Sequence, residues 1–412
     1  MTKTMIDLSS VVEAAERIAP MVVRTPAFEA AALGELSGAR VSLKLETRQR
    51  TGAFKDRGAA NRILQLEPHE RERGVIAMSA GNHAQSVAYV CRQLGIPATI
   101  VMPEGTPFTK VRRTQGFGAR VVIAGADLNG AEARARAIMD AEGLTLVHPY
   151  DDERVIAGQG TIALEWLADV PELDVMLIPV GGGGLISGIA IAAKALKPSI
   201  EIVAVQTELF PSIARRRAGL EPLPGGQTTI AEGIAVKAAG LLPMEIIDRL
   251  VDDVVLVSEE ALECAIHLFL EEEKLLAEGA AAASLAALLQ DPERYAGRNV
   301  GVIVCGGNLD TGLLATVITR ARMREGRVVS LRMEIPDRPG VLADISQIIG
   351  ASGANIIEVK HQRFFYDVPS KHADLDVTIE TRDPGDIGEI LAKLAARDYS
   401  AHVLMSTRAH GR

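Results

Sequence analysis

Short apolar runs alternate with stretches of helical periodicity over most of the chain, and this alternation restricts the possible folds more than any other feature. Val75–Met78, Ala98–Met102 and Val175–Val180 are predicted strands. The segments that follow the first and the third, Asn82–Leu94 and Gly184–Leu196, are predicted helices. Strand–helix alternation at this spacing is typical of a mostly parallel sheet covered by helices. We therefore expect an α/β fold that extends to about residue 322.

The pattern changes after a basic stretch that ends at residue 327. The expected elements beyond it are a strand, a helix, two strands, a helix and a strand. Their bounds are Val328–Ile335, Val341–Ser352, Asn355–Phe365, Ala373–Thr381, Gly385–Arg397 and Tyr399–Met405. This βαββαβ order is the ferredoxin-like arrangement. We expect residues 323–327 to be a linker and residues 328–412 to be a separate domain of about 85 residues.

Composition argues against several kinds of partner and location. The net charge is −9 and only 3% of the residues are aromatic, which disfavours nucleic acid and anionic membranes as partners. The three cysteines lie far apart, as expected for a reduced, cytoplasmic protein. Residues 1–25 lack the apolar core of a signal peptide. Val175–Ala193 carries no charge, but Pro179 and four glycines favour a buried strand, turn and helix over a membrane span.

Lys55 lies where a predicted strand gives way to a helix. The segment around it, Thr51–Ala59, follows the strand-like run Val41–Glu46 and places Phe54 and small residues beside the lysine. The positive end of a helix disfavours an ammonium group, which would lower the pKa of Lys55. A free amine can attack a carbonyl carbon and form a Schiff base. The alternative interpretation is an ordinary exposed lysine on a helix.

A second candidate site segment, Ser79–His83, joins a buried strand to a helix. Ligands of open α/β sheets bind at such carboxyl ends of parallel strands. The turn and the Ser79 hydroxyl suit a carboxylate, and Asn82 offers both a donor and an acceptor. The alternative is a capping turn, with Ser79 or Asn82 as the N-cap. His83 is interpreted as a structural helix histidine.

The third segment is a run of four glycines, Gly181, Gly182, Gly183 and Gly184, followed by Leu185. It also joins an apolar strand to a helix. Glycines allow positive φ and bring backbone N–H groups close to an anion, so a phosphate is the expected ligand. The spacing matches neither a dinucleotide-binding fingerprint nor a Walker loop, so the phosphate need not belong to a nucleotide. A plain packing turn is the alternative.

The fourth segment, Cys305-Gly306-Gly307-Asn308, ends another apolar strand. Cys305 is either a buried core thiol or a weak, neutral partner for a ligand atom, and no neighbouring histidine supports a nucleophilic role. Polar side chains at three strand ends, together with one lysine at a helix entry, predict a single shared site.

These segments together resemble the threonine dehydratases, or threonine ammonia-lyases, which are pyridoxal-phosphate enzymes of the tryptophan-synthase-β-like fold (fold type II). The motifs that carry the resemblance are Thr51–Ala59, Ser79–His83, Ala157–Thr161, Gly181–Leu185, Thr229–Lys237 and Cys305–Asn308. The tail from Val328, with Asp337-Arg338-Pro339-Gly340, is similar to an ACT domain, an amino-acid-sensing module. The resemblance implies two α/β subdomains within residues 1–322, the smaller inserted at about residues 50–148.

The resemblance also implies how pyridoxal 5′-phosphate would be held. Lys55 would carry it as a Schiff base, with Phe54 beside the ring. Asn82 would hydrogen-bond the ring hydroxyl, and Gly181–Gly184 with Leu185 would hold the phosphate.

On the same grounds, Cys305 would lie at the pyridine nitrogen, and Ser79 with its turn would bind the substrate carboxylate. Gln206 stands in a stretch that lacks the glutamate with which a divalent-metal site begins in the serine-racemase branch, so no metal is expected.

The implied activity is the dehydration and deamination of L-threonine to 2-oxobutanoate and ammonia, with L-serine converted to pyruvate as a side reaction. A serine racemase or a hydroxyaspartate dehydratase would share every motif. A catalytically dead amino-acid-sensing regulator is the alternative of another class, and the intact Lys55 argues against it.

The ACT-like tail implies allosteric control in amino-acid metabolism, such as isoleucine biosynthesis. We expect a branched-chain amino acid to bind between paired tails of a homotetramer or homodimer. Gly340 and the first turn of the helix after it would contact this effector, because a Pro-Gly turn leaves N–H groups free for a carboxylate. A purely oligomerising domain is the alternative.

Overall fold

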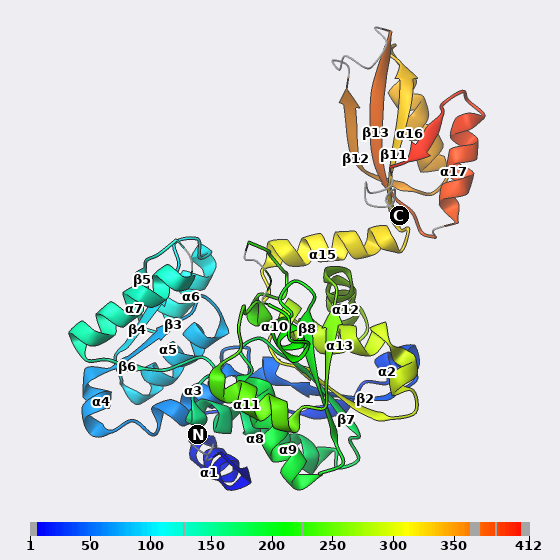
Figure 1. Cartoon of the computed structure of the whole chain (residues 1–412). Helices are drawn as coiled ribbons and strands as arrows, with labels where there is room; N and C mark the ends of the chain where they lie inside the picture. The colour runs from blue at the N-terminus through cyan, green and yellow to red at the C-terminus, as the bar shows by residue number, and fades with distance from the viewer. Residues whose placement is uncertain are drawn as a thin grey trace. The chain divides into compact units, whose positions relative to one another are not determined.

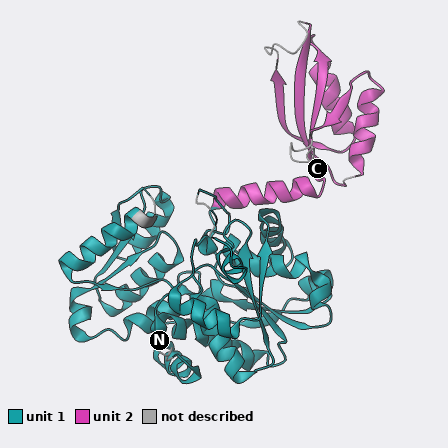
Figure 2. Cartoon of the chain, in the orientation of Figure 1, with its two compact units in different colours: residues 1–310 teal, residues 311–412 magenta. Residues whose placement is uncertain are grey.

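The computed structural model of the chain describes residues 6–126, 128–221, 223, 226–362, 371–383 and 385–404. The chain divides into two compact units, residues 1–310 and 311–412 (Figure 2). In the described part of the chain, no helix has the length and apolar character needed to cross a membrane.

The larger sheet of the first unit has six strands in the order β1-β2-β10-β7-β8-β9. The strands are β1 (Ala27–Glu29), β2 (Arg40–Leu45), β7 (Val175–Pro179), β8 (Glu201–Thr207), β9 (Asp253–Val257) and β10 (Asn299–Val304). All neighbours are parallel except β1, which pairs with β2 in the antiparallel sense. The predicted parallel α/β fold is confirmed, and β1 and β9 are strands that were not predicted from the sequence.

The smaller sheet is fully parallel and has the order β5-β4-β3-β6. Its strands are β3 (Val75–Met78), β4 (Ala98–Met102), β5 (Arg120–Ile123) and β6 (Thr145–Leu146). Its apolar core is formed with α3 and α5, through residues such as Ile63, Val87 and Ile100. The sheet lies wholly within residues 75–146, inside the stretch expected to form the inserted subdomain.

Helices flank both sheets of the first unit (Figure 1). They are α1 (Leu8–Ile18), α2 (Ala31–Ser37), α3 (Lys55–Ile63), α4 (Pro68–Arg73), α5 (Asn82–Leu94), α6 (Phe108–Gly116), α7 (Leu128–Glu142), α8 (Glu153–Asp169), α9 (Gly184–Leu196), α10 (Ser212–Arg217), α11 (Leu241–Leu250), α12 (Glu259–Glu271), α13 (Gly279–Gln290) and α14 (Pro292–Tyr295). Two short 3₁₀ turns, η1 (Glu46–Arg48) and η2 (Glu232–Ile234), complete it. The apolar run from Val175 is a buried strand, turn and helix, as predicted.

Close packing of α8 against α3 and α9 explains the glycines of the Ala157–Thr161 motif. A Cβ on Gly158 would lie 2.7 Å from the Arg57 carbonyl oxygen, and a Cβ on Gly188 would lie 2.3 Å from the Ile156 carbonyl oxygen. Real side-chain atoms do not approach backbone so closely, so only glycine allows these helices to meet. Because α3 begins at Lys55 and α9 follows the four glycines, α8 sets the spacing between the two segments.

The second unit contains α15 (Thr311–Arg324) and an antiparallel sheet of order β12-β13-β11-β14. Its elements are β11 (Val328–Pro336), α16 (Val341–Ala351), β12 (Asn355–Gln362), β13 (His372–Glu380), α17 (Asp386–Ala395) and β14 (Ala401–Val403). The predicted βαββαβ order is confirmed. The expected ends of two strands, residues 363–365 and residue 405, lie outside the described residues.

The boundary between the units differs from the expected one. The chain divides after Asp310, and α15 continues to Arg324, within the stretch expected to be a linker. The first residue beyond α15 that disfavours a helix is Gly326, since the arginines before it are good helix formers. Residues 323 and 324 of the expected linker belong to the last turn of α15, whereas residues 325–327 connect α15 to β11.

Candidate active site

The segment that carries Lys55 is joined by backbone contacts to the carboxyl end of β10. The Phe54 N–H donates to the Cys305 carbonyl at 3.0 Å, and residues 52–53 contact residues 306–307 through a further hydrogen bond and an isolated β-bridge. Two segments that lie far apart in sequence thus form one wall. The expected meeting of Lys55 with the Cys305 strand end is observed.

The Lys55 amine is partly buried at this wall. Its Nζ donates to the Pro149 carbonyl at 2.8 Å and lies 5.0 Å from the centre of the Phe54 ring. Burial lowers the pKa of Lys55 to about 8, although the nearby Cys305 and Glu278 oppose the shift. The lowered pKa was predicted from the helix end, but its main physical cause is desolvation. An appreciable fraction of the amine is therefore unprotonated near neutral pH.

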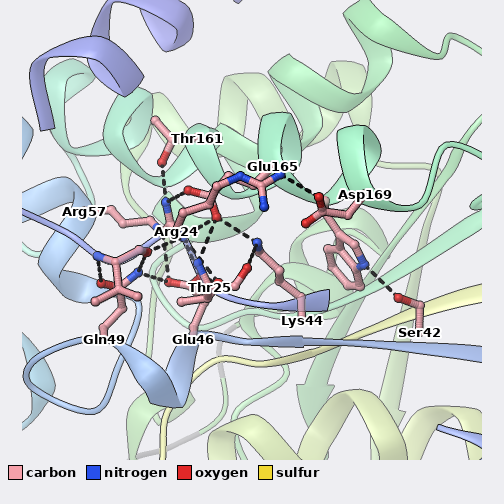
Figure 3. A network of polar contacts seen from close by, with 12 residues as sticks. Arg24, Thr25, Ser42, Lys44, Glu46, Gln49, Arg57, Thr161, Glu165 and Asp169 are labelled. Atoms are coloured by element: carbon pink, nitrogen blue, oxygen red, sulfur yellow. Dashed lines mark hydrogen bonds and ion pairs between the residues drawn. The ribbon is translucent and has the colours of Figure 1, made fainter. Parts of the chain in front are cut away.

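A buried ion-pair network fixes helix α3, whose first residue is Lys55 (Figure 3). The Arg57 guanidinium donates to both oxygens of Glu46 and to both oxygens of Glu165, at 2.7 to 2.9 Å. Lys44 also donates to Glu165, at 2.7 Å. Two positive and two negative groups balance each other in this interior, which is what makes their burial tolerable. The network ties α3 to β2 and α8.

Asn82, the first residue of α5, is held at both ends of its amide. Its Nδ2 donates to Glu278 Oε1 at 2.7 Å, and its Oδ1 accepts from Asn308 Nδ2 at 2.8 Å. Asn308 Nδ2 also donates to the Thr51 carbonyl, at 2.8 Å. These contacts join the Asn82 turn, the Lys55 segment and the end of β10 into one site.

The turn before Asn82 is not the capping turn considered above. The N-cap of α5 is Gly81, which makes no side-chain cap, and the Ser79 hydroxyl accepts from the Gly81 N–H at 3.2 Å. His83 is buried, and its Nε2 lies 2.8 Å from the Val147 carbonyl. Burial, reinforced by the charge of Lys55, lowers the pKa of His83 to about 3. His83 is therefore neutral, which agrees with its interpretation as a structural histidine.

The four glycines form a tight turn between β7 and α9. Gly183 has φ +95°, and a Cβ on Gly182 would lie 2.2 Å from the Tyr150 ring. Because Tyr150 follows Pro149, the acceptor of the Lys55 amine, the glycine turn and the lysine border the same short segment. The first N–H groups of a helix have no partners within the helix. The turn therefore suits an anion beside Lys55.

The Cys305 side chain is 2% exposed, and burial raises its pKa well above the usual value, with the charge of Glu278 adding to the shift. The thiol is therefore protonated and neutral at physiological pH. A buried, neutral thiol agrees with both interpretations of Cys305, a core residue and a weak partner for a ligand atom, and it argues against a nucleophile.

A contact between Lys110 and Glu232 joins the part of the first unit around the smaller sheet to the part around the larger sheet, near this site. Lys110, on α6 beside the smaller sheet, forms an ion pair with Glu232 of η2. The charges of both residues influence the carboxyl of Glu278. Residues 234 and 236, at and just beyond the end of η2, lie against Gly181. The motif at residues 229–237 is therefore part of the wall between the glycine turn and Glu278.

Comparison with known proteins agrees with this geometry. Residues 18–306 match the family described as pyridoxal-phosphate dependent enzymes, and residues 324–399 match the ACT domain. The chain belongs to the pyridoxal-phosphate dependent enzyme family. The resemblance that the sequence motifs indicated is confirmed, as are the fold class and the cofactor.

Relatives within the pyridoxal-phosphate dependent enzyme family include an L-threonine ammonia-lyase of Thermotoga maritima. It is 41% identical over 401 residues, which is 97% of this chain and all of that one. Among solved structures, a threonine deaminase from T.th. is 39% identical with a TM-score of 0.70, covering 74% of this chain and 99% of that one. Maize serine racemase is 36% identical with a TM-score of 0.72, covering 77% and 98%.

The residues present fit pyridoxal phosphate. The Lys55 amine, whose pKa is lowered, donates to Pro149. The next residue, Tyr150, lies against the glycine turn, whose N–H groups can bind a phosphate. A neutral thiol and a fixed amide lie on the same wall. Lys55, Asn82, the glycine turn and Cys305 would hold the group.

The sequence did not identify three residues that complete the site: Glu278, Asn308 and Pro149. Each contacts a residue that is distant in sequence; Asn82 and Glu278, for example, are 196 positions apart. The one available signal for Glu278 was a single acidic residue directly before an alanine-rich helix. Asn308 closed a quoted motif, but nothing in the sequence showed its partners.

Proposed function

We propose that this chain is a threonine ammonia-lyase, which converts L-threonine to 2-oxobutanoate and ammonia and acts more slowly on L-serine to give pyruvate. The observation that carries the proposal is the Lys55 amine, with a pKa of about 8, held against the strand end that bears the neutral Cys305 thiol. The similarity to an L-threonine ammonia-lyase over nearly the whole chain supports the choice of substrate.

The proposed binding roles follow the positions of the side chains. Lys55 would bond to the cofactor, and Phe54 would pack beside it. The glycine turn, Gly181–Gly184 with Leu185, binds the phosphate through backbone N–H groups. Asn82 offers an N–H to the ring hydroxyl, and the turn that begins at Ser79 binds the substrate carboxylate.

Pyridoxal phosphate supplies an aldehyde for the substrate amine and a conjugated ring that accepts the electrons of the breaking Cα–H bond. With the cofactor bound, Lys55 would take the α-proton of the substrate, and its lowered pKa keeps a free-base fraction ready for this task. The β-hydroxyl would leave as water by taking up one proton, which balances the proton removed from the α-carbon. The released enamine would then add one water and lose ammonia to give the oxo acid.

Cys305 directs the reaction toward elimination. Its buried thiol stays neutral, so at the ring nitrogen it would not hold a proton as a carboxylate would. Negative charge that develops at the α-carbon is then relieved by loss of the β-hydroxyl. We therefore expect elimination to exceed racemisation.

One comparison of substrates tests the proposal. L-threonine, L-serine and 3-hydroxyaspartate are incubated with the holoenzyme, and oxo acid, ammonia and the chirality of residual serine are measured. We expect 2-oxobutanoate and ammonia in equal amounts, with threonine as the best substrate. The similarity to serine racemases keeps that activity as a second candidate. Predominant formation of D-serine, or a preference for hydroxyaspartate, would contradict the proposal.

We further propose that the ACT domain senses a branched-chain amino acid and that the enzyme is a cytoplasmic homotetramer or homodimer. In the structure, Gly340 has φ +92° and caps α16, as the Pro-Gly turn suggested. The exposed turn at Gly340 is the proposed contact for the effector carboxylate. A biosynthetic role, in the formation of isoleucine, and a degradative role both remain predictions.

A further inference from the structure

Glu278 directs its carboxyl away from the helix that it begins. It is the N-cap residue of α13, yet its side chain makes no cap hydrogen bond. Its backbone N–H donates to the Gly306 carbonyl at 3.0 Å, which fixes the residue beside the end of β10. The carboxyl oxygen Oε1 instead accepts from Asn82, 2.7 Å away.

The two partners of Asn82 fix which way its amide points. Asn308 Nδ2 is a donor, so the Asn82 atom that it contacts must be the oxygen. Asn308 cannot be turned round without loss of its donation to the Thr51 carbonyl. The Asn82 nitrogen therefore faces Glu278. It carries two hydrogens, of which Glu278 takes one.

The backbone around Glu278 leaves room for this arrangement. A Cβ on Gly306 would lie 2.4 Å from Glu278 Oε1 and 2.8 Å from its carboxyl carbon, so any larger residue would displace the carboxyl. The glycine next to Cys305 thus serves the position of Glu278 as well as the turn.

We propose that Glu278 is a positioning residue that acts through Asn82: with Asn308 it locks the Asn82 amide so that one N–H stays directed to the cofactor. The inference deepens the proposed function, because it rests on the binding role proposed for Asn82. No direct contact between Glu278 and the substrate is invoked.

The charges around Glu278 agree with an acceptor role. Burial raises the pKa of Glu278 to about 7, and the negative charge of Glu232 adds to this rise. The hydrogen bonds that Glu278 accepts from Asn82 and from the Asn308 backbone N–H, together with the positive charge of Lys110, oppose it. The charge of Glu278 also raises the pKa values of Lys55 and Cys305. Two roles are therefore separable, a hydrogen-bond acceptor for Asn82 and a negative charge beside Lys55.

The test is a binding titration that needs no substrate. Full-length apoenzyme is titrated with pyridoxal phosphate, and the Kd is measured from the visible absorbance of the Lys55 Schiff base. Glu278→Gln keeps an acceptor oxygen at the same reach but removes the charge. Glu278→Asp keeps the charge but shortens the side chain by one methylene, so it cannot reach Asn82. Glu273→Gln, a change of a carboxyl outside the site, is the matched control, and circular dichroism verifies folding.

We expect Glu278→Asp to raise the Kd for pyridoxal phosphate about tenfold. The Kd of Glu278→Gln should stay within about threefold of that of the unmodified chain, and the Kd of Glu273→Gln should be unchanged. In an Asn82→Ala background, Glu278→Asp should have no further effect, because the group through which it acts is gone. Equal effects in both backgrounds, or a Gln variant weaker than the Asp variant, would overturn the inference.

The same titration separates this inference from the proposal on which it rests. If Asn82→Ala binds the cofactor as tightly as the unmodified chain, the role of Asn82 is wrong and Glu278 has nothing to position. If Asn82→Ala weakens binding and both Glu278 variants do not, only the role of Glu278 fails.

Discussion

Lys55 combines a partly buried position with a hydrogen bond to a carbonyl rather than to a carboxylate. A carboxylate partner would have held the proton on the amine. The Pro149 carbonyl also fixes the direction of the side chain, but because it carries no net charge it stabilises the protonated amine less than a carboxylate would. The same residue can therefore be fixed in direction and still be reactive near neutral pH.

This balance predicts how the capture of cofactor depends on pH. The free-base fraction of a group with a pKa of about 8 rises about tenfold between pH 7 and pH 9. The rate at which apoenzyme forms the Schiff base with pyridoxal phosphate should rise by a similar factor over that range. Stopped-flow absorbance measures this rate, with Lys55→Ala as the control that forms no Schiff base. A rate independent of pH would contradict the lowered pKa.

The buried position of Arg57 leads to a second prediction, on the free energy of unfolding. Arg57→Ala leaves Glu46 and Glu165 buried without their main partner, and loss of one member of a buried network costs about 3–5 kcal/mol. Arg24→Ala, which breaks an exposed pair with Asp169, should cost less than about 1 kcal/mol. Urea unfolding of the two variants compares them. Similar losses in both would mean that the buried network contributes no more than a surface pair.

Glycines in the interior of helices set the packing of α3, α8 and α9. Their spacing was visible in the sequence as part of a family motif, but its reason was not. Gly158 meets Gly58 of α3, and Gly160 meets Gly188 of α9, so each pair brings two helices together without side chains. The distance between the Lys55 amine and the glycine turn follows from these contacts.

Gly188→Ala should therefore disturb both stability and cofactor binding. The new Cβ would meet a backbone carbonyl at 2.3 Å, so α8 and α9 must move apart, at a cost of about 1–3 kcal/mol. Gly350→Ala in α16, where a Cβ would meet nothing within 4 Å, is the control and should be neutral or slightly stabilising. Melting temperature and cofactor Kd are the measurements. An unchanged Kd for Gly188→Ala would mean that α8 does not set the spacing.

Elements with strong local signals were predictable, and elements without them were not. The strands β3, β4 and β7 are apolar runs bounded by turns, and they lie where the sequence predicted them. In contrast, β1 has only three residues and no clear period, and its pairing with β2 cannot be seen in the local sequence. β9 contains the apolar run Val254–Val257, a signal of the same kind as that of β3, and its prediction was missed.

The two units of the chain would separate chemistry from regulation. Every proposed binding residue for cofactor and substrate lies between Phe54 and Cys305, within the first unit. The threonine deaminase from T.th. is covered over 99% of its length by 74% of this chain. The sequence predicted both domains. The boundary between them could not be predicted, because it depends on whether α15 packs with the first or the second unit, and these contacts place α15 in the second.

Removal of the second unit tests this separation. A chain that ends at residue 310 should bind pyridoxal phosphate and deaminate threonine, and should lose any response to isoleucine or valine. Titration of both amino acids against the initial rate compares it with the full chain. The cut is made at residue 310 rather than 327, because α15 belongs to the second unit and would otherwise be left without its packing partners. An effector response that survives the truncation would rule out the ACT domain as the sensor.

The pairing of β2 with β10 has a consequence for how the enzyme is made. Leu45 lies opposite Val304, so the wall that holds Lys55 cannot close until a late part of the chain has left the ribosome. At roughly 5–20 residues per second, that delay is on the order of 13–50 s. Until Val304 of the 412-residue chain has emerged, Lys55 lacks the burial that lowers its pKa, so the amine acquires its reactivity only when this wall closes.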